Sequence, residues 1–354
     1  MTKTEEAIEA LRTIKDENTG DSLIDLGWLN QVRINPPRSI VRMSLPEYAL
    51  KQRTNIAQQV RVILESFSDI DDVQIELSNP TKSSPIGQAG HGEVNNLQPV
   101  QGIKKIIAIS SGKGGVGKST VAVNLACALA KKGSSVGLLD ADIYGPNTPT
   151  MLGVADVSPE VSGSGENQKI TPIDCCGISM VSMGLLIDEN QPVIWRGPML
   201  NGIIRQFLYQ TDWGEKDFLI VDLPPGTGDA QLSLAQAVPM AGAIIVTTPQ
   251  KVSLQDSRRG LEMFKKMNVP VLGVVENMSV FIPPDDPDKT YKIFGSGGGN
   301  QLAEENNVPL LAQIPLEIPV LNEASEGKPI VNVYPQLSSS KAFISLAEII
   351  LKYI

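Results

Sequence analysis

Residues 111–120 read Ser-Gly-Lys-Gly-Gly-Val-Gly-Lys-Ser-Thr, and this stretch decides the fold. The apolar residues Ile103–Ser110 in front of it predict a buried strand, and Ser119–Lys132 behind it predict a helix with Gly133 at its C-terminal cap. A strand, a glycine-rich loop and a helix in this order are typical of a P-loop. The sequence therefore predicts an α/β domain that binds the phosphates of a nucleotide.

Each residue type in this loop has a predicted task. Glycines leave room for backbone amides to close on phosphate oxygens, and the N-terminus of the following helix adds partial positive charge. Lys118 is predicted to reach the β- and γ-phosphates, and the hydroxyl of Ser119 is predicted to ligate Mg²⁺. The predicted nucleotide-binding residues of the loop are Gly112, Lys113, Gly114, Gly115, Val116, Gly117, Lys118, Ser119 and Thr120.

Two further apolar stretches end in aspartate. Val136–Asp140 predicts a strand with Asp142 just beyond it, and Phe218–Asp222 predicts another in front of a loop that contains Pro-Pro-Gly-Thr-Gly. The carboxyl ends of parallel strands form the edge of the sheet that binds ligands. Asp222 fits a Walker B carboxylate, which holds Mg²⁺ directly or through water. Asp229 fits either a role at this edge or the cap of a helix that begins at residue 230.

The rest of the chain divides into three predicted parts: a small α/β domain at residues 1–80, a linker at 81–102 and the P-loop domain at 103–354. Helices at 4–15 and 46–67 and strands near Val32, near Ile40 and at 73–77 are predicted in the small domain. The linker is rich in Pro, Ser, Gly and Asn and holds His91, to which no role is assigned. The P-loop domain is predicted to be a doubly wound, mostly parallel sheet of seven or eight strands, with all nucleotide groups at one edge.

Composition excludes several classes of function. A formal net charge of −9 argues against a nucleic-acid partner. The chain has no run of 18 apolar residues, and its first residues are polar. We therefore expect no membrane association and a cytoplasmic location. Three cysteines give no disulfide framework. Cys127 is expected in the core, whereas Cys175-Cys176, an adjacent pair without the usual spacing of metal ligands, is open between packing and cluster binding across a dimer.

Lys113, one residue after the first glycine of the loop, has no counterpart in an ordinary Walker A motif. Here the sequence resembles the deviant Walker A ATPases, which include MinD, ParA, the nitrogenase iron protein and the Mrp/ApbC iron–sulfur carriers. The resemblance implies a homodimer that binds ATP, in which Lys113 reaches the partner's nucleotide. It also implies catalytic roles for Lys113, Lys118, Asp142 as switch I and Asp222 in switch II, a metal site at Ser119, Asp140 and Asp222, and contact of Asn277 with adenine.

Further motifs narrow the resemblance. They lie at 144–149 (Tyr-Gly-Pro-Asn-Thr-Pro), 195–199 (Trp-Arg-Gly-Pro-Met), 276–279 (Glu-Asn-Met-Ser) and 294–299 (Phe-Gly-Ser-Gly-Gly-Gly). With a small domain similar to the SufT-like metal–sulfur assembly family, they identify the chain as a member of the Mrp/ApbC-type iron–sulfur cluster carrier ATPases. This resemblance implies an ATP-hydrolysing factor that binds iron–sulfur clusters and transfers them to apoproteins.

One departure from that family concerns the cluster itself. Most members carry Cys-x-x-Cys between the last two motifs, and two such pairs bridge one [4Fe–4S] cluster in the dimer. Residues 280–293 contain no cysteine here, although Asp285, Asp286 and Asp288 could offer oxygen ligands to a hard cation. A nucleotide-gated scaffold without its own cluster therefore stays open. A MinD-like spatial regulator is a weaker alternative, because the amphipathic tail at 341–354 has only two lysines for a membrane surface.

Overall fold

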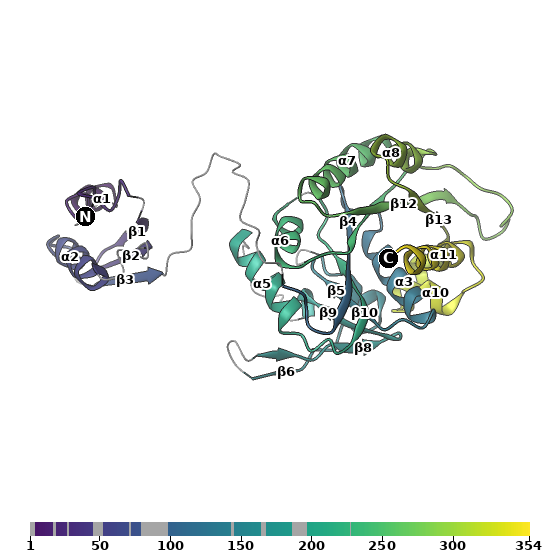
Figure 1. The fold of residues 1–354 in the computed structure, drawn as a ribbon, viewed down its shortest axis with the longest axis horizontal. Coiled ribbons are helices and arrows are strands. Elements are labelled where there is room, and N and C mark those ends of the chain that lie inside the picture. Colours follow the sequence, from purple (N-terminus) through teal and green to yellow (C-terminus); the bar gives the residue numbers. More distant parts are fainter. Residues whose placement is uncertain are drawn as a thin grey trace. The chain divides into compact units, whose positions relative to one another are not determined.

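The computed structural model describes residues 4–16, 19–26, 28–44, 52–70, 72–78, 98–142, 145–163, 168–185, 197–226 and 228–354 (Figure 1). The chain divides into two compact units, Met1–Gly92 and Glu93–Ile354. Most of the predicted linker, including His91, lies outside the described residues. Within the described residues, no helix is long and apolar enough to cross a membrane.

The N-terminal unit packs two helices on a three-stranded sheet of order β1-β2-β3. β1 and β2 form an antiparallel hairpin, and α2 connects β2 to the parallel strand β3. Ile56, Val60 and Leu64 recur every four residues along α2 and are buried, which explains why this segment is helical. The first helix is shorter than predicted, because Lys15 pairs with Ser22 in a β-bridge as the chain turns back. The elements are α1 (Thr4–Leu11), β1 (Leu29–Asn35), β2 (Arg38–Ser44), α2 (Arg53–Glu65) and β3 (Asp72–Ser78).

The second unit is built on an eight-stranded sheet of order β13-β12-β11-β4-β10-β5-β9-β8. All neighbouring strands are parallel except β8, which pairs antiparallel with β9 at one edge. The P-loop strand β4 is central, so the strands predicted to end in aspartate lie beside it. The strands are β4 (Ile103–Ser111), β5 (Val136–Asp140), β8 (Ile173–Cys175), β9 (Ile178–Ser182), β10 (Lys216–Asp222), β11 (Gly242–Thr247), β12 (Val271–Phe281) and β13 (Leu310–Leu316), and a separate hairpin joins β6 (Val161–Ser162) to β7 (Lys169–Ile170).

Helices cover both faces of this sheet (Figure 1). Side chains alternate along β4: Ile107 and Ile109 pack with α3 and α11, whereas Ile106 and Ala108 pack with α5, α6 and α7. The helices are α3 (Lys118–Lys131), α4 (Thr148–Met151), α5 (Gly197–Tyr209), α6 (Asp229–Ala237), α7 (Lys251–Lys266), α8 (Gly298–Asn306), α9 (Ile318–Ser325), α10 (Ile330–Val333) and α11 (Ser338–Tyr353), with a 3₁₀ turn at Met183–Leu185.

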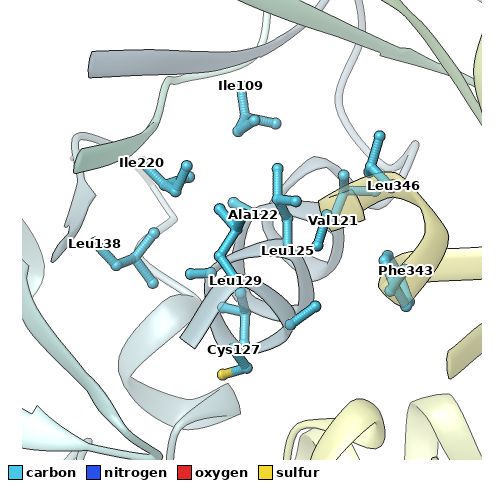
Figure 2. Packing of buried hydrophobic residues seen from close by; sticks show 14 of the residues in the cluster. Ile109, Val121, Ala122, Leu125, Cys127, Leu129, Leu138, Ile220, Phe343 and Leu346 are labelled. Carbon is cyan, nitrogen blue, oxygen red and sulfur yellow. The ribbon is translucent and has the colours of Figure 1, made fainter. Parts of the chain in front are cut away.

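The P-loop helix α3 is held on both sides. Figure 2 shows its side chains, among them Leu125 and Leu129, between residues of the sheet such as Ile220 and residues of α11 such as Phe343. Cys127 is fully buried in this cluster, which confirms the prediction that it belongs to the core. Truncating a buried leucine here would cost about 2–5 kcal/mol. The core therefore fixes the direction in which α3 presents its N-terminus.

Candidate nucleotide site

The glycine-rich loop runs from the end of β4 to the start of α3, as predicted, and two of its glycines are needed because of their neighbours. A Cβ on Gly112 would overlap the backbone of Asp256 and Ser257 in α7. Gly117 has a φ of +79°, and a Cβ there would overlap the side-chain amide of Asn277. The loop is thus clamped between α7 and the middle of β12.

Lys118 and Asp222 form a buried ion pair at the base of the loop. The Nζ of Lys118 donates to Oδ1 of Asp222 at 2.6 Å, and the two side chains are 6% and 0% exposed. The pair forms because β10 lies directly beside β4, which brings the end of β10 under the first turn of α3. The Oδ2 atom of Asp222 is buried and has no hydrogen-bond partner in the structure. A buried carboxylate oxygen of this kind is a ready acceptor for a further cation or donor.

Asp140 is tied to its own surroundings. Its Oδ2 accepts hydrogen bonds from the hydroxyls of Thr148 at 2.7 Å and Ser182 at 3.0 Å, and its Oδ1 accepts from the backbone N–H of Asp142 at 3.1 Å. These contacts join β5 to the start of α4 and the end of β9. Asp140 therefore positions the segment that carries Asp142.

The pKa of Asp140 is raised to about 7, first by burial and then by the neighbouring Asp222 carboxylate. The folded protein thus holds this proton more tightly than the unfolded chain, in which the pKa is about 4. The stability that the Asp140 proton contributes to the folded state is present at low pH. It is lost as the pH rises through the pKa of this group in the folded protein. We expect the unfolding free energy of the ligand-free P-loop unit to fall by on the order of 2–3 kcal/mol between about pH 5 and pH 8.

Urea unfolding in the presence of EDTA across this pH range would measure the effect. The chain has one histidine, so few other groups titrate in the same window. Asp140→Asn should flatten the slope, because the amide does not titrate. A slope that is as steep in Asp140→Asn as in the parent protein would contradict the assignment to this residue.

A cavity of about 160 Å³ opens above the loop. Among its lining residues are Lys118 and Asp142, which were predicted to act on the bound nucleotide, and Lys113, which was predicted to reach the nucleotide of the partner. Lys113 is exposed, and no ion pair to it occurs among the described residues. Asp142 is 8% exposed. The other predicted residues in the lining are Gly114, Gly115, Gly117, Ser119 and Thr120, whereas Gly112 and Val116 lie in the same loop behind it.

Asn277 lies against the back of the P-loop, and its Nδ2 donates to the carbonyl of Val116 at 2.8 Å. The preceding residue, Glu276, is buried and accepts from the backbone N–H of Gly299 at 2.5 Å and from Gln313 at 2.8 Å. A Cβ on Gly299 would overlap Glu276, so the triple glycine at 297–299 allows α8 to begin on this carboxylate. Contact of Asn277 with adenine stays a prediction.

The loop after Asp222 is fastened at both ends. The backbone N–H of Gly226 donates to the carbonyl of Ser111 at 2.8 Å, at the start of the P-loop. The Nε2 of Gln231 donates at 2.8 Å to the carbonyls of both Pro224 and Gly226. Helix α6 begins at Asp229, one residue earlier than predicted, with Gly228 at its N-cap. Asp229 is therefore the first residue of the helix and not its cap.

The three cysteines lie at the other end of the sheet. Cys175 ends β8, and Cys176 forms the turn into β9, whose far end at Ser182 is the one that touches Asp140. Burial raises the pKa of Cys175 to about 12, and it also raises the pKa values of Cys127 and of the exposed Cys176. Thiols with raised pKa values are poor metal ligands at neutral pH.

Residues 280–293, the segment without a Cys-x-x-Cys pair, form a closed loop. Phe281 and Tyr291 exchange backbone hydrogen bonds of 2.8 and 2.9 Å, and Lys289 lies 5.0 Å from the centre of the Tyr291 ring. The carboxylates inside the loop, Asp285, Asp286 and Asp288, are exposed. Among the described residues, no group of three or more His, Cys, Asp or Glu side chains is arranged to hold a metal ion.

Sequence patterns missed four residues that shape the site: Thr148 and Ser182 around Asp140, Gln231 below the loop after Asp222, and Glu276 at the start of α8. Thr148 and Glu276 lay inside quoted motifs, but their hydrogen-bond partners depend on strand order. The Tyr144 and Trp195 positions of those motifs, with Thr227, lie outside the described residues.

Comparison with known proteins now decides the family. The profile described as ParA, the NUBPL iron-transfer P-loop NTPases, matches residues 102–351. The chain belongs to this family. A second profile, described as an iron–sulfur cluster assembly protein, matches residues 4–77 of this NUBPL-type NTPase. Both parts of the resemblance seen in the sequence are thereby confirmed.

Relatives of this NUBPL-type NTPase carry consistent names. The "iron-sulfur cluster carrier protein" of Synechocystis sp. is 51% identical over 98% of this chain and 97% of its own length. The "iron-sulfur cluster transfer protein NUBPL" of Mus musculus is 46% identical over 72% of this chain and 77% of its own.

Solved structures confirm the predicted fold class. A nucleotide-binding protein from Archaeoglobus fulgidus, solved in complex with ADP, superposes with a TM-score of 0.57 at 34% identity and covers 68% of this chain and 96% of its own. The cell division ATPase MinD of Pyrococcus furiosus gives a TM-score of 0.52 at 26% identity and covers 71% of this chain and 99% of its own. The second unit is thus a nucleotide-binding P-loop NTPase of the MinD type.

Proposed function

We propose that this protein is a homodimeric ATPase that carries iron–sulfur clusters to apoproteins in the cytoplasm. The observation that carries the ATPase part is the Lys118–Asp222 pair at the base of a cavity that also contains Lys113 and Asp142. The names of the relatives support the carrier part. The nucleotide state would control when a cluster or an apoprotein is bound and released.

The residues present fit a Mg²⁺ ion. The orphaned Oδ2 of Asp222 and the hydroxyl of Ser119, which lies 3.4 Å from Nζ of Lys118, are hard oxygen donors at one place. They would hold the ion, with Asp140 as support for the surrounding loops. When bound, Mg²⁺ offsets charge on the transferring phosphoryl group.

The chain's own groups would divide the remaining work. Lys118 would exchange its Asp222 partner for phosphate oxygens, as a point charge with three donors. Asp142, held by the Asp140 contact at the cavity wall, would orient the attacking water. Lys113, which is exposed and makes no ion pair among the described residues, would reach the partner's phosphates, where a cation stabilises developing charge.

The cluster is cargo, and its ligands are the open part of this proposal. The loop at 282–292 offers no thiol, and the cysteine pair lies at the end of β9 opposite the nucleotide edge. That separation favours a second candidate, a nucleotide-gated scaffold that binds client proteins without a cluster of its own.

Anaerobic reconstitution with iron and sulfide separates the two candidates. A carrier should retain about four iron and four sulfide ions per dimer and should activate an apo [4Fe–4S] protein. If Cys175 and Cys176 are ligands, the Cys175→Ser/Cys176→Ser variant should lose the metal, while Cys127→Ala, which changes only a core thiol, should retain it. ATP-dependent binding of the apoprotein with no bound iron would instead establish the scaffold. A protein that does not bind ATP would refute both.

A further inference from the structure

A groove of about 490 Å³ lies between α6 and α7. Its floor is apolar and consists of Leu232 from α6, Met263 from the last turns of α7 and Met267, the C-cap residue of α7. Leu232 is 37% exposed, and both methionines are half-buried against the core beneath. Methionine side chains adapt to differently shaped partners, so such a floor suits a binding surface.

The rim of the groove is basic in an acidic protein. Arg258, Arg259 and Lys266 line it together with one carboxylate, Glu262, although the whole chain carries a formal charge of −9. Arg258 is paired with Glu305. Arg259 is 75% exposed and lies 3.3 Å from the carboxylate of Asp256. Lys266 is exposed and has no ion pair within the described residues. Two cations are therefore directed to solvent at the rim.

The same face of α7 continues toward its N-terminus. Residues seven apart lie on one side of a helix, which places Val252 in line with Arg259 and Lys266. Val252 is 60% exposed, so the row that carries the two rim cations ends in an apolar side chain beyond the groove. The groove itself, with an apolar floor and a cationic rim, matches the face of an amphipathic helix.

Both walls of the groove touch the nucleotide loops. One residue before Leu232, the buried Gln231 holds the loop after Asp222 through Pro224 and Gly226. In α7, the backbone at Asp256 and Ser257 is the surface against which Gly112 of the P-loop packs. A shift of α6 or α7 would therefore move the loops of the phosphate site, and a movement of those loops would change the shape of the groove.

We propose that this groove binds an acidic amphipathic helix of a partner protein, and that its affinity depends on the bound nucleotide. Acidic side chains of the helix would meet Arg259 and Lys266, and its apolar side chains would lie on Leu232, Met263 and Met267. The docking goes beyond the carrier function proposed above, because it requires no cluster. Linkage then requires that the helix also change the affinity for nucleotide by the same factor.

A labelled peptide tests this directly. The probe is an amphipathic helix of about 20 residues with leucine on one face and glutamate on its flanks, and its control carries lysine in place of every glutamate. Fluorescence anisotropy measures binding to the full-length protein with ADP and with a non-hydrolysable ATP analogue. The groove variant is Arg259→Glu/Lys266→Glu. The matched control, Lys341→Glu/Lys352→Glu on α11, makes the same charge change on another exposed helix.

The groove variant should weaken binding of the acidic peptide at least about tenfold, and the α11 variant should change it less than about twofold. Affinities in the two nucleotide states should differ at least about fivefold. The docking site is overturned by any of three results: no saturable binding at about 1 mM, equal loss in both variants, or equal binding of the lysine peptide. The docking site would also be overturned if duplex DNA or phosphatidylserine vesicles bound equally well and lost binding in the groove variant. Equal peptide affinities with ADP and with the ATP analogue would refute the coupling to nucleotide. Thermal melting of each variant confirms that it is folded.

Discussion

Lys118→Met is expected to lower the affinity for ATP by a factor of at least about a thousand, which corresponds to about 4 kcal/mol. Lys118 is the buried cation of the phosphate cavity, whereas Lys113 is exposed. Its replacement removes charge-assisted hydrogen bonds for which the cavity has no substitute. Isothermal titration calorimetry with MgATP would measure the change, and tight binding by the variant would refute the P-loop prediction.

The Lys118→Met variant needs a control for stability. Asp222 is fully buried, and loss of its 2.6 Å partner leaves an uncompensated charge, at a cost of about 3–5 kcal/mol. Lys118→Met/Asp222→Asn removes both charges and should recover most of the stability but none of the ATP affinity. Lys132→Ala, which breaks only a surface ion pair with Glu348, should leave ATP binding unchanged.

The second large effect is expected at Lys113. Lys113→Ala should leave the affinity for ATP within about threefold of the parent, because this side chain is exposed and makes no ion pair among the described residues of its own protomer. ATP-dependent dimerisation should be lost, and turnover should fall at least about a hundredfold, as happens when a cation on the transferring phosphoryl group is removed. Analytical ultracentrifugation and phosphate release measure the two quantities. Unchanged turnover would show that Lys113 is an ordinary surface residue.

Mixing two inactive variants shows whether Lys113 acts in the partner's site. In a mixed dimer of Lys113→Ala with Asp142→Ala, one site has its own Asp142 and receives Lys113 from the other protomer. Random pairing of all protomers would give half mixed dimers with one complete site of two, so turnover should rise toward about a quarter of the parent value if the lysine acts in trans. If Lys113 acts within its own protomer, no mixed dimer has a complete site and turnover stays at the level of the single variants.

The strands that carry the site were predictable because each combines a run of buried apolar residues with an aspartate or glycine at its end, as in β5 and β10. The length of β12 was not. It continues from Glu276 to Phe281 because Phe281 pairs with Leu316 and Tyr291, which are distant in the sequence. Periodicity within one segment contains no information about such partners.

The residues of the P-loop could likewise be assigned from their spacing, whereas their supports could not. Asp140 meets Ser182 only because β9 lies next to β5, and that order follows from how the whole sheet is assembled. The position of the cysteine pair, at the end of β9 opposite Ser182, depends on the same strand order.

The packing of Gly112 and Gly117 changes how the glycine-rich motif should be interpreted across related proteins. Gly112 is required by the neighbouring α7 backbone and Gly117 by its φ of +79°, whether or not a nucleotide binds. A descendant that had lost hydrolysis would still be selected to keep them, because larger residues would disrupt the fold. Lys113 has no such obligation to the fold, so its retention or loss is the better record of whether a lineage still uses ATP.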